Sequence, residues 1–267
     1  MTELAGPGRL IALSLLSGWT AADTTEAVQL MVCQPLPAGL LAGCLCGQPA
    51  LGLFMGTALQ LLWSRLAPVG AASMPDVGPA TVAGVAVAVE LAPRGVAWLP
   101  SPRGLFPPEE LSVGLLAGLL TALFTGRAAQ ALVVGFRRGN DRLVRQADAA
   151  ATQGDFSGVE RANAAGAWRA FLRGVLTLPV VLLIVAALGA LAGALAPLLK
   201  VSEASGTATA RALGRLLPFL STNPGPVLFW WFGVAALLTT LWRGKGRDLL
   251  WLLGGLAAGG VLSLGLQ

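Results

Sequence analysis

The sequence contains no histidine, and only 12% of its residues are charged. Without histidine the chain cannot supply a Ser-His-Asp or Cys-His catalytic centre, a histidine metal ligand or a phosphohistidine. Soluble domains usually carry about 25% charged residues, so the shortage of charge argues against a soluble domain. We predict no catalytic residue, no metal site and no cofactor on this chain.

Cysteine is also scarce. Cys33, Cys44 and Cys46 are the three cysteines, and all lie in apolar sequence. The Cys44-x-Cys46 pair has no second pair to complete a zinc site, and nothing suggests a disulfide framework. We expect the three thiols to behave as small hydrophobic side chains.

Apolar residues make up what is present: 55% of the chain is hydrophobic and the mean hydropathy is +0.73. A soluble core cannot use that much apolar surface, whereas a lipid bilayer can. The net charge of +5 is typical of membrane proteins, which accumulate arginine in cytoplasmic loops. The composition therefore predicts an all-α, polytopic transmembrane protein in contact with lipid rather than nucleic acid.

Long apolar segments divide the chain, and a spanning helix needs about 20 residues. Glycine and proline interrupt the second segment, which is too long for one simple span, and this predicts broken or re-entrant helices in the N-terminal half. Close packing of helices through small residues explains the same glycines, and both readings stay open. The apolar segments are 9–22, 36–63, 67–92, 111–136, 172–199, 226–242 and 249–266.

One long polar segment, 137–171, interrupts the apolar sequence with an excess of arginine, and Arg173 follows it directly. The positive-inside rule predicts that this basic loop is cytoplasmic, and two apolar spans separate it from a second basic loop at 243–247. We predict a single membrane domain over 1–267. It consists of an N-terminal membrane half (9–136), the cytoplasmic basic loop (137–171) and a C-terminal membrane half (172–267).

Polar residues within apolar sequence are costly in a membrane and are candidates for function. Gln29 and Gln34 flank a short apolar run, and Gln60 lies in the apolar segment that follows. Glutamine amides both donate and accept hydrogen bonds, as sugar hydroxyls require. The alternative for Gln60 is a hydrogen bond between two helices.

Three further polar residues lie beside breaks in the apolar sequence. Asp76 follows Pro75, so its carboxylate could cap a helix over 77–92 or accept hydrogen bonds from a sugar. Asp23 is more simply explained as the cap of a helix start. Asn223 lies in a polar turn, which is a substrate contact or only a turn.

Three motifs between Asp23 and Asp76 follow one another at characteristic spacing. The segment Gln29–Leu36 matches a Gln, a few apolar residues and Arg-Pro-Leu; Gly56–Gln60 matches Gly-x-x-Leu-Glu; and Gly70–Asp76 matches Gly-Ala-Ala-x-x-Pro-Asp. The run resembles the C subunit, or permease, of the mannose/fructose/sorbose family of the bacterial phosphotransferase system. It departs from that pattern at Gln34, where the family has arginine, and at Gln60, where it has glutamate.

The resemblance implies a permease in the bacterial cytoplasmic (inner) membrane, with several spans. Such a subunit binds and translocates a hexose-like sugar together with a D subunit, in homo-oligomers of C–D pairs. A separate cytoplasmic B subunit, supplied by an A subunit, phosphorylates the sugar. The sugar-binding residues expected here are Gln29, Gln34, Gln60, Asp76 and Asn223.

Two other functions stay open. The charges replaced at Gln34 and Gln60 suggest a degenerate member with a regulatory or scaffolding role. The third possibility is a permease subunit of an unrelated importer, in which the 137–171 segment would dock an ATPase.

Overall fold

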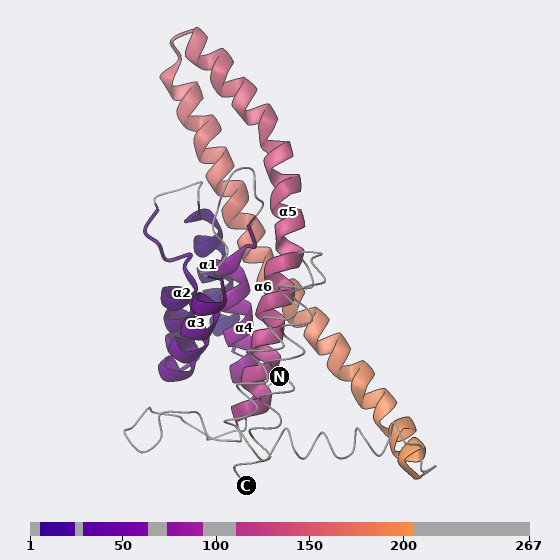
Figure 1. Cartoon of the computed structure of the whole chain (residues 1–267). Helices are drawn as coiled ribbons and strands as arrows, with labels where there is room; N and C mark the ends of the chain where they lie inside the picture. Colours follow the sequence, from indigo (N-terminus) through magenta and orange to yellow (C-terminus); the bar gives the residue numbers. More distant parts are fainter. Residues whose placement is uncertain (1–5, 25–28, 64–73, 93–110, 205–267) are drawn as a thin grey trace, which may run out of the picture. The chain divides into compact units, whose positions relative to one another are not determined.

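The computed structural model describes residues 6–24, 29–63, 74–92 and 111–204. The elements in these ranges are all helices, without a strand, which confirms the all-α prediction (Figure 1). They are α1 (Pro7–Ala22), α2 (Pro35–Leu45), α3 (Pro49–Trp63), α4 (Val77–Leu91), α5 (Ser112–Thr152) and α6 (Phe156–Ala204). The predicted spans at 226–242 and 249–266, and Asn223, lie outside the described residues.

The chain divides into two compact units. The first contains residues 1–91 and 117–184, and the second contains residues 92–116 and 185–267. Helices α1 to α4 and most of α5 and α6 belong to the first unit. In the second unit, the described helical residues are the start of α5 and the end of α6.

The long apolar segment 36–63 is indeed broken, into α2 and α3. Each helix has a proline at its first position, where the missing N–H costs nothing. Gly47 ends α2 with φ +73°, and the N–H of Gln48 donates to the carbonyl of Gly43 at 2.7 Å. This left-handed glycine turn reverses the chain between helices of 11 and 15 residues. Both are shorter than a simple span, and a re-entrant path remains a prediction.

Glycines also bring α2 and α3 into backbone contact. A Cβ atom at Gly39 would lie 2.6 Å from the Gly52 carbonyl oxygen and 2.7 Å from the Cα of Gly56. A Cβ atom at Gly43 would lie 2.8 Å from the Cα of Gly52. The segment is therefore both broken into two helices and closely packed through its glycines.

Helix α4 forms the centre of the first unit. Its residues from Gly78 to Val89 are all buried, and it packs against α1, α2 and α3. Residues 74–76 precede it without helical structure, as expected for the residues around Pro75. Helix α4 therefore positions Asp76 at the edge of a mostly apolar core.

The segment 137–171 is a helical hairpin rather than an irregular loop. Helix α5 continues to Thr152 and α6 begins at Phe156, so only three residues join them (Figure 1). Alanine-rich sequence favours helix throughout this polar segment. The Arg169 guanidinium crosses from α6 to α5 and donates to the carbonyl of Gly139 and the amide oxygen of Asn140, each at 3.4 Å. Its cytoplasmic location remains a prediction.

Helices α5 and α6 contain the described segments that are long and apolar enough to cross a membrane, by length and composition. They include the predicted spans 111–136 and 172–199. On α6, Leu176, Val180, Leu183 and Ile184 are exposed at helical spacing. An exposed apolar stripe of this kind is unfavourable in water and is suited to lipid.

Candidate functional site

The carboxylate of Asp23 organises the loop between α1 and α2. The backbone N–H groups of Leu30 and Cys33 donate to its two oxygens at 2.6 and 2.9 Å. Asp23 is buried and follows the last residue of α1. The expectation that it caps a helix start is therefore wrong, because its oxygens bind loop amides beyond a helix end. Between those amides, Met31 has the left-handed φ of 63°, which is unfavourable for a side chain with a Cβ.

The loop leads directly to Gln34, whose side chain meets that of Gln60. The Gln60 amide nitrogen donates to the Gln34 amide oxygen at 3.2 Å. The Gln60 amide oxygen accepts from the N–H of Leu36 at 3.4 Å, in the first turn of α2. Two of the three glutamines predicted to bind sugar, Gln34 and Gln60, thus lie together across α2 and α3. The hydrogen bond between helices expected as the alternative for Gln60 is also present.

Gln29 and Asn223 are not brought into this cluster by the structure. Gln29 is exposed at the start of the described loop. Asn223 lies outside the described residues. The structure therefore gives geometry for three of the five predicted sugar-binding residues, namely Gln34, Gln60 and Asp76.

Asp76 lies at a junction between helices α4, α5 and α6. Its carboxylate oxygen Oδ2 is 3.0 Å from Nη1 of Arg173 on α6, and the two side chains are 2% and 6% exposed. Its N–H donates to the carbonyl of Gly126 on α5 at 3.3 Å, and its carbonyl accepts from Ala80 on α4. The residue thus occupies the capping position of α4, while its side chain forms a buried ion pair.

The glutamine loop and the start of α4 are in contact. A Cβ atom at Gly78 would lie 3.1 Å from the carbonyl oxygen of Cys33 and 2.7 Å from Cβ of Thr20. Gly78 is two residues beyond Asp76, and Cys33 directly precedes Gln34. The backbone that leads to Gln34 therefore packs against the start of α4, near the residue that forms the ion pair. We call these five side chains together the polar cluster (Asp23, Gln34, Gln60, Asp76 and Arg173).

Arg173 is the member of the polar cluster that sequence reasoning missed. It was grouped with the preceding basic segment because it follows 137–171 directly. Its signal was present in the sequence, since Leu172 and Gly174-Val175 flank it at the start of an apolar span. A charge inside a span needs a partner, and that partner is Asp76.

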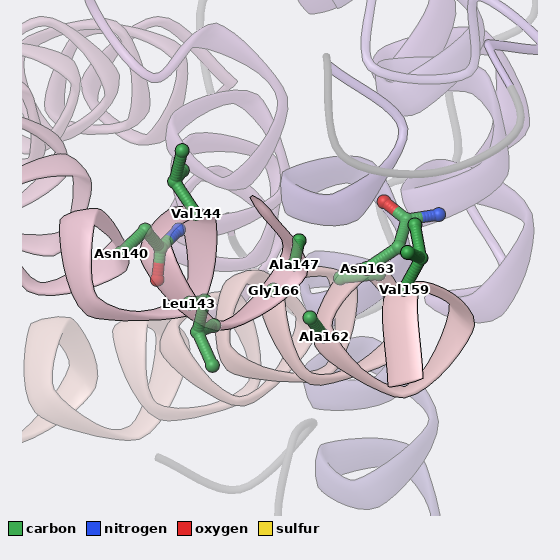
Figure 2. Close-up of a pocket in the computed structure, with 9 residues that line it drawn as sticks. Asn140, Leu143, Val144, Ala147, Val159, Ala162, Asn163 and Gly166 are labelled. Atoms are coloured by element: carbon green, nitrogen blue, oxygen red, sulfur yellow. The ribbon is translucent and has the colours of Figure 1, made fainter. Parts of the chain in front are cut away.

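A separate pocket lies between α5 and α6 in the helical hairpin. It has a volume of about 440 Å³ and contains none of the predicted site residues (Figure 2). Its lining is mostly apolar, with two asparagine side chains. Asn140, Leu143, Val144, Ala147, Val159, Ala162, Asn163, Gly166 and Ala167 line it. Within the described ranges there is no group of three or more potential metal-ligating Cys, Asp or Glu residues.

Together these features describe an all-helical chain in which buried polar side chains lie among apolar helices, and α5 and α6 are long and apolar enough to cross a membrane by length and composition. The family of the PTS (phosphotransferase system) sorbose-specific IIC component matches residues 9–222. The chain belongs to this family, which confirms the predicted resemblance to the mannose/fructose/sorbose permeases. No curated protein matches the chain. Sugar transport as part of a phosphotransferase system is thus the general function of the protein.

Proposed function

We propose that this chain is the sugar-translocating C subunit, and that its polar cluster binds a hexose-like sugar within the membrane. The observation that carries the proposal is the contact between Gln34 and Gln60, the two glutamines of separate motifs. Their amides offer donors and acceptors to sugar hydroxyls, and the Asp76 carboxylate offers acceptors. The Gln34 and Gln60 amides, which hydrogen bond to each other in this structure, would hydrogen bond to the sugar instead.

Membership of the family supports association with other components of a phosphotransferase system. A D subunit in the membrane would complete the permease, and cytoplasmic A and B subunits would carry the phosphoryl group. The chain contains no histidine, so phosphorylation by a separate B subunit is consistent with its composition. We propose homo-oligomers of C–D pairs in the bacterial inner membrane, with Gln29 and Asn223 as further sugar contacts.

The amide pair bears on the scaffolding alternative. Loss of one charge from an ion pair would leave the other buried and unpaired, which is strongly unfavourable. Here both motif positions carry glutamine, and the two side chains are hydrogen bonded. The two positions therefore make a polar contact without a buried charge, which supports a working site rather than a degenerate one.

Uptake and phosphorylation of labelled sorbose, fructose and mannose test the function in cells that express all partner subunits. Cells with this chain should accumulate at least one sugar phosphate, and cells without it should not. Asp76→Ala should abolish uptake, and the amount of chain in the membrane reports its insertion separately. Unchanged uptake of every sugar tried would instead support a regulatory or scaffolding role.

The membrane orientation needs its own test. In a variant whose cysteines are replaced by alanine, Gln153→Cys in the hairpin turn should react with an impermeant thiol reagent only after the cells are opened. Labelling in intact cells would contradict the cytoplasmic location of the 137–171 hairpin.

A further inference from the structure

Arg173 stands out because it is a charged side chain enclosed almost completely by the protein. Its guanidinium is 6% exposed and lies 3.0 Å from the Asp76 carboxylate. Neither its Nε nor its Nη1 has an aligned hydrogen bond within the described part of the chain. Electrostatic attraction therefore holds the Asp76–Arg173 pair together, and the Nε and Nη1 donors of Arg173 make no aligned hydrogen bond.

The position of Arg173 is fixed by the packing of α6 on α1. Next to it, the Ser17 hydroxyl donates to the Gly174 carbonyl at 2.7 Å. A Cβ atom at Gly174 would lie 2.8 Å from Cα of Gly18, so the two helices approach at backbone distance. The guanidinium also lies 5.9 Å from the centre of the Phe136 ring on α5, within the range of a cation–π contact. These contacts leave the side chain little freedom to turn away from Asp76.

Burial determines what the pair can do. A carboxylate enclosed among apolar helices is strongly disfavoured as an ion unless a positive charge accompanies it. With Arg173 beside it, Asp76 can remain ionised, and an ionised carboxylate only accepts hydrogen bonds. An acceptor in a fixed position, with neighbouring amides, matches the hydroxyl groups of a sugar.

We infer that Arg173 is the positioning residue of the sugar site: it holds the Asp76 carboxylate ionised and oriented at the start of α4. The inference rests on the proposed role of Asp76 in sugar binding. It adds a residue from α6 to a site whose predicted residues in the described part all lie between α1 and α4. Sugar affinity would therefore depend on a helix that contributes no predicted sugar contact.

The test compares Arg173→Met, Arg173→Lys and the double variant Asp76→Asn with Arg173→Met, each assembled with all partner subunits. Initial uptake of the transported sugar is measured per inserted molecule over a range of concentrations. Arg145→Met, an exposed arginine of the hairpin, is the matched control and should keep the wild-type KM. The amount of chain in the membrane reports folding separately.

Arg173→Met should raise the KM for sugar by about tenfold or more, because the carboxylate loses its orientation and its counter-charge. Arg173→Lys should recover part of that loss, since it retains the charge without the planar fork. The double variant removes the carboxylate charge together with that of Arg173, so it should insert normally and still fail to take up sugar. If Arg173→Met does not insert into the membrane, uptake by Arg173→Lys and by the double variant still tests the role of Arg173.

Two results would overturn the inference. One is a wild-type KM in Arg173→Met or in the double variant, which would make the pair purely structural. The other is an Arg173→Lys variant no better than Arg173→Met, which would show that the charge is irrelevant. Absence of uptake by the wild-type chain would instead contradict the proposed function itself.

Discussion

At the scale of single residues, the two positions that depart from the family pattern, Gln34 and Gln60, lie in contact with each other. The resemblance implies arginine and glutamate at these positions, and here two amides face one another at 3.2 Å. A neutral pair avoids the cost of burying two ions, and it keeps donors and acceptors for a ligand. We therefore predict that the two positions are energetically coupled.

Charge swaps test this coupling. Gln34→Arg or Gln60→Glu alone should lower the thermal stability of the purified protein in detergent, because each leaves a partly buried charge without a partner. Each loss should be about 1–3 kcal/mol. The double variant should recover most of it, as measured by a double-mutant cycle. Additive losses would show that the two side chains do not interact.

Asp23 holds the loop that precedes Gln34, because it accepts hydrogen bonds from the backbone amides of Leu30 and Cys33. Those two amides have no other acceptor among the described hydrogen bonds. Asp23→Ala should cost about 1–3 kcal/mol for the donors left unsatisfied, and it should reduce sugar uptake by releasing the loop before Gln34. Asp148→Ala, which removes an exposed carboxylate on α5, is the matched control. Equal thermal stability of the two variants would contradict the role of Asp23.

At the scale of elements, the α2–α3 hairpin depends on glycines that allow the two backbones to touch. Gly52→Ala places a methyl group 2.6 Å from Cα of Gly43, so the helices must separate. We expect a loss of about 1–3 kcal/mol in stability, typical of overpacking, together with loss of the contact between Gln34 and Gln60. Thermal unfolding and uptake measure the two effects.

Gly139→Ala provides the control for that substitution. Gly139 is a helical glycine of α5 with nothing within 4 Å of an added Cβ atom. Because alanine favours helix, this change should be neutral or slightly stabilising. A similar loss of stability in both variants would show that helix propensity, rather than close approach, explains the Gly52 effect.

The turn between α5 and α6 should respond to acid. The Ser157 hydroxyl at 2.6 Å and the Gly158 N–H at 3.0 Å both donate to Asp155 and, with Arg161, lower the pKa of its carboxyl. A lowered folded-state pKa means that the turn is favoured above the unfolded value of about 3.9. That support is lost as the pH falls through the lowered pKa.

Hydrogen exchange measures this dependence at the Gly158 amide. After correction for the intrinsic rate, protection should be constant from about pH 6 to pH 5 and should fall as the pH drops below about 4. Asp155→Asn should remove the change with pH. Constant protection in the wild-type chain down to about pH 2 would contradict the role of the carboxylate.

Local patterns predicted the elements well, and long-range contacts were missed. The break within 36–63 and the helix after Pro75 follow from glycine and proline, whose backbone restrictions are local. The helical hairpin at 137–171 was expected only as a loop with helical composition. The Asp76–Arg173 pair joins residues far apart in the sequence, and no local pattern encodes which acid meets which base.

At the scale of the whole molecule, the apolar composition and the family membership both indicate a permease component in a membrane. The family match extends from residue 9 to residue 222 and therefore includes every described helix from α2 to α6. Helices α5 and α6 are long and apolar enough to cross a membrane, whereas the hydrogen-bonded glutamines lie at the shorter helices: Gln34 directly before α2 and Gln60 in α3. We propose that the polar cluster recognises the sugar and that other chains transfer the phosphoryl group.

Equilibrium binding of labelled sorbose, fructose and mannose to the purified complex of the C and D subunits tests this account most directly. We predict saturable binding of at least one sugar, equal in the wild-type and Gly139→Ala chains, and reduced at least about tenfold in Asp76→Ala and Gln60→Ala. Binding that is unchanged in both of these variants, or no binding of any sugar to the wild-type complex, would contradict it.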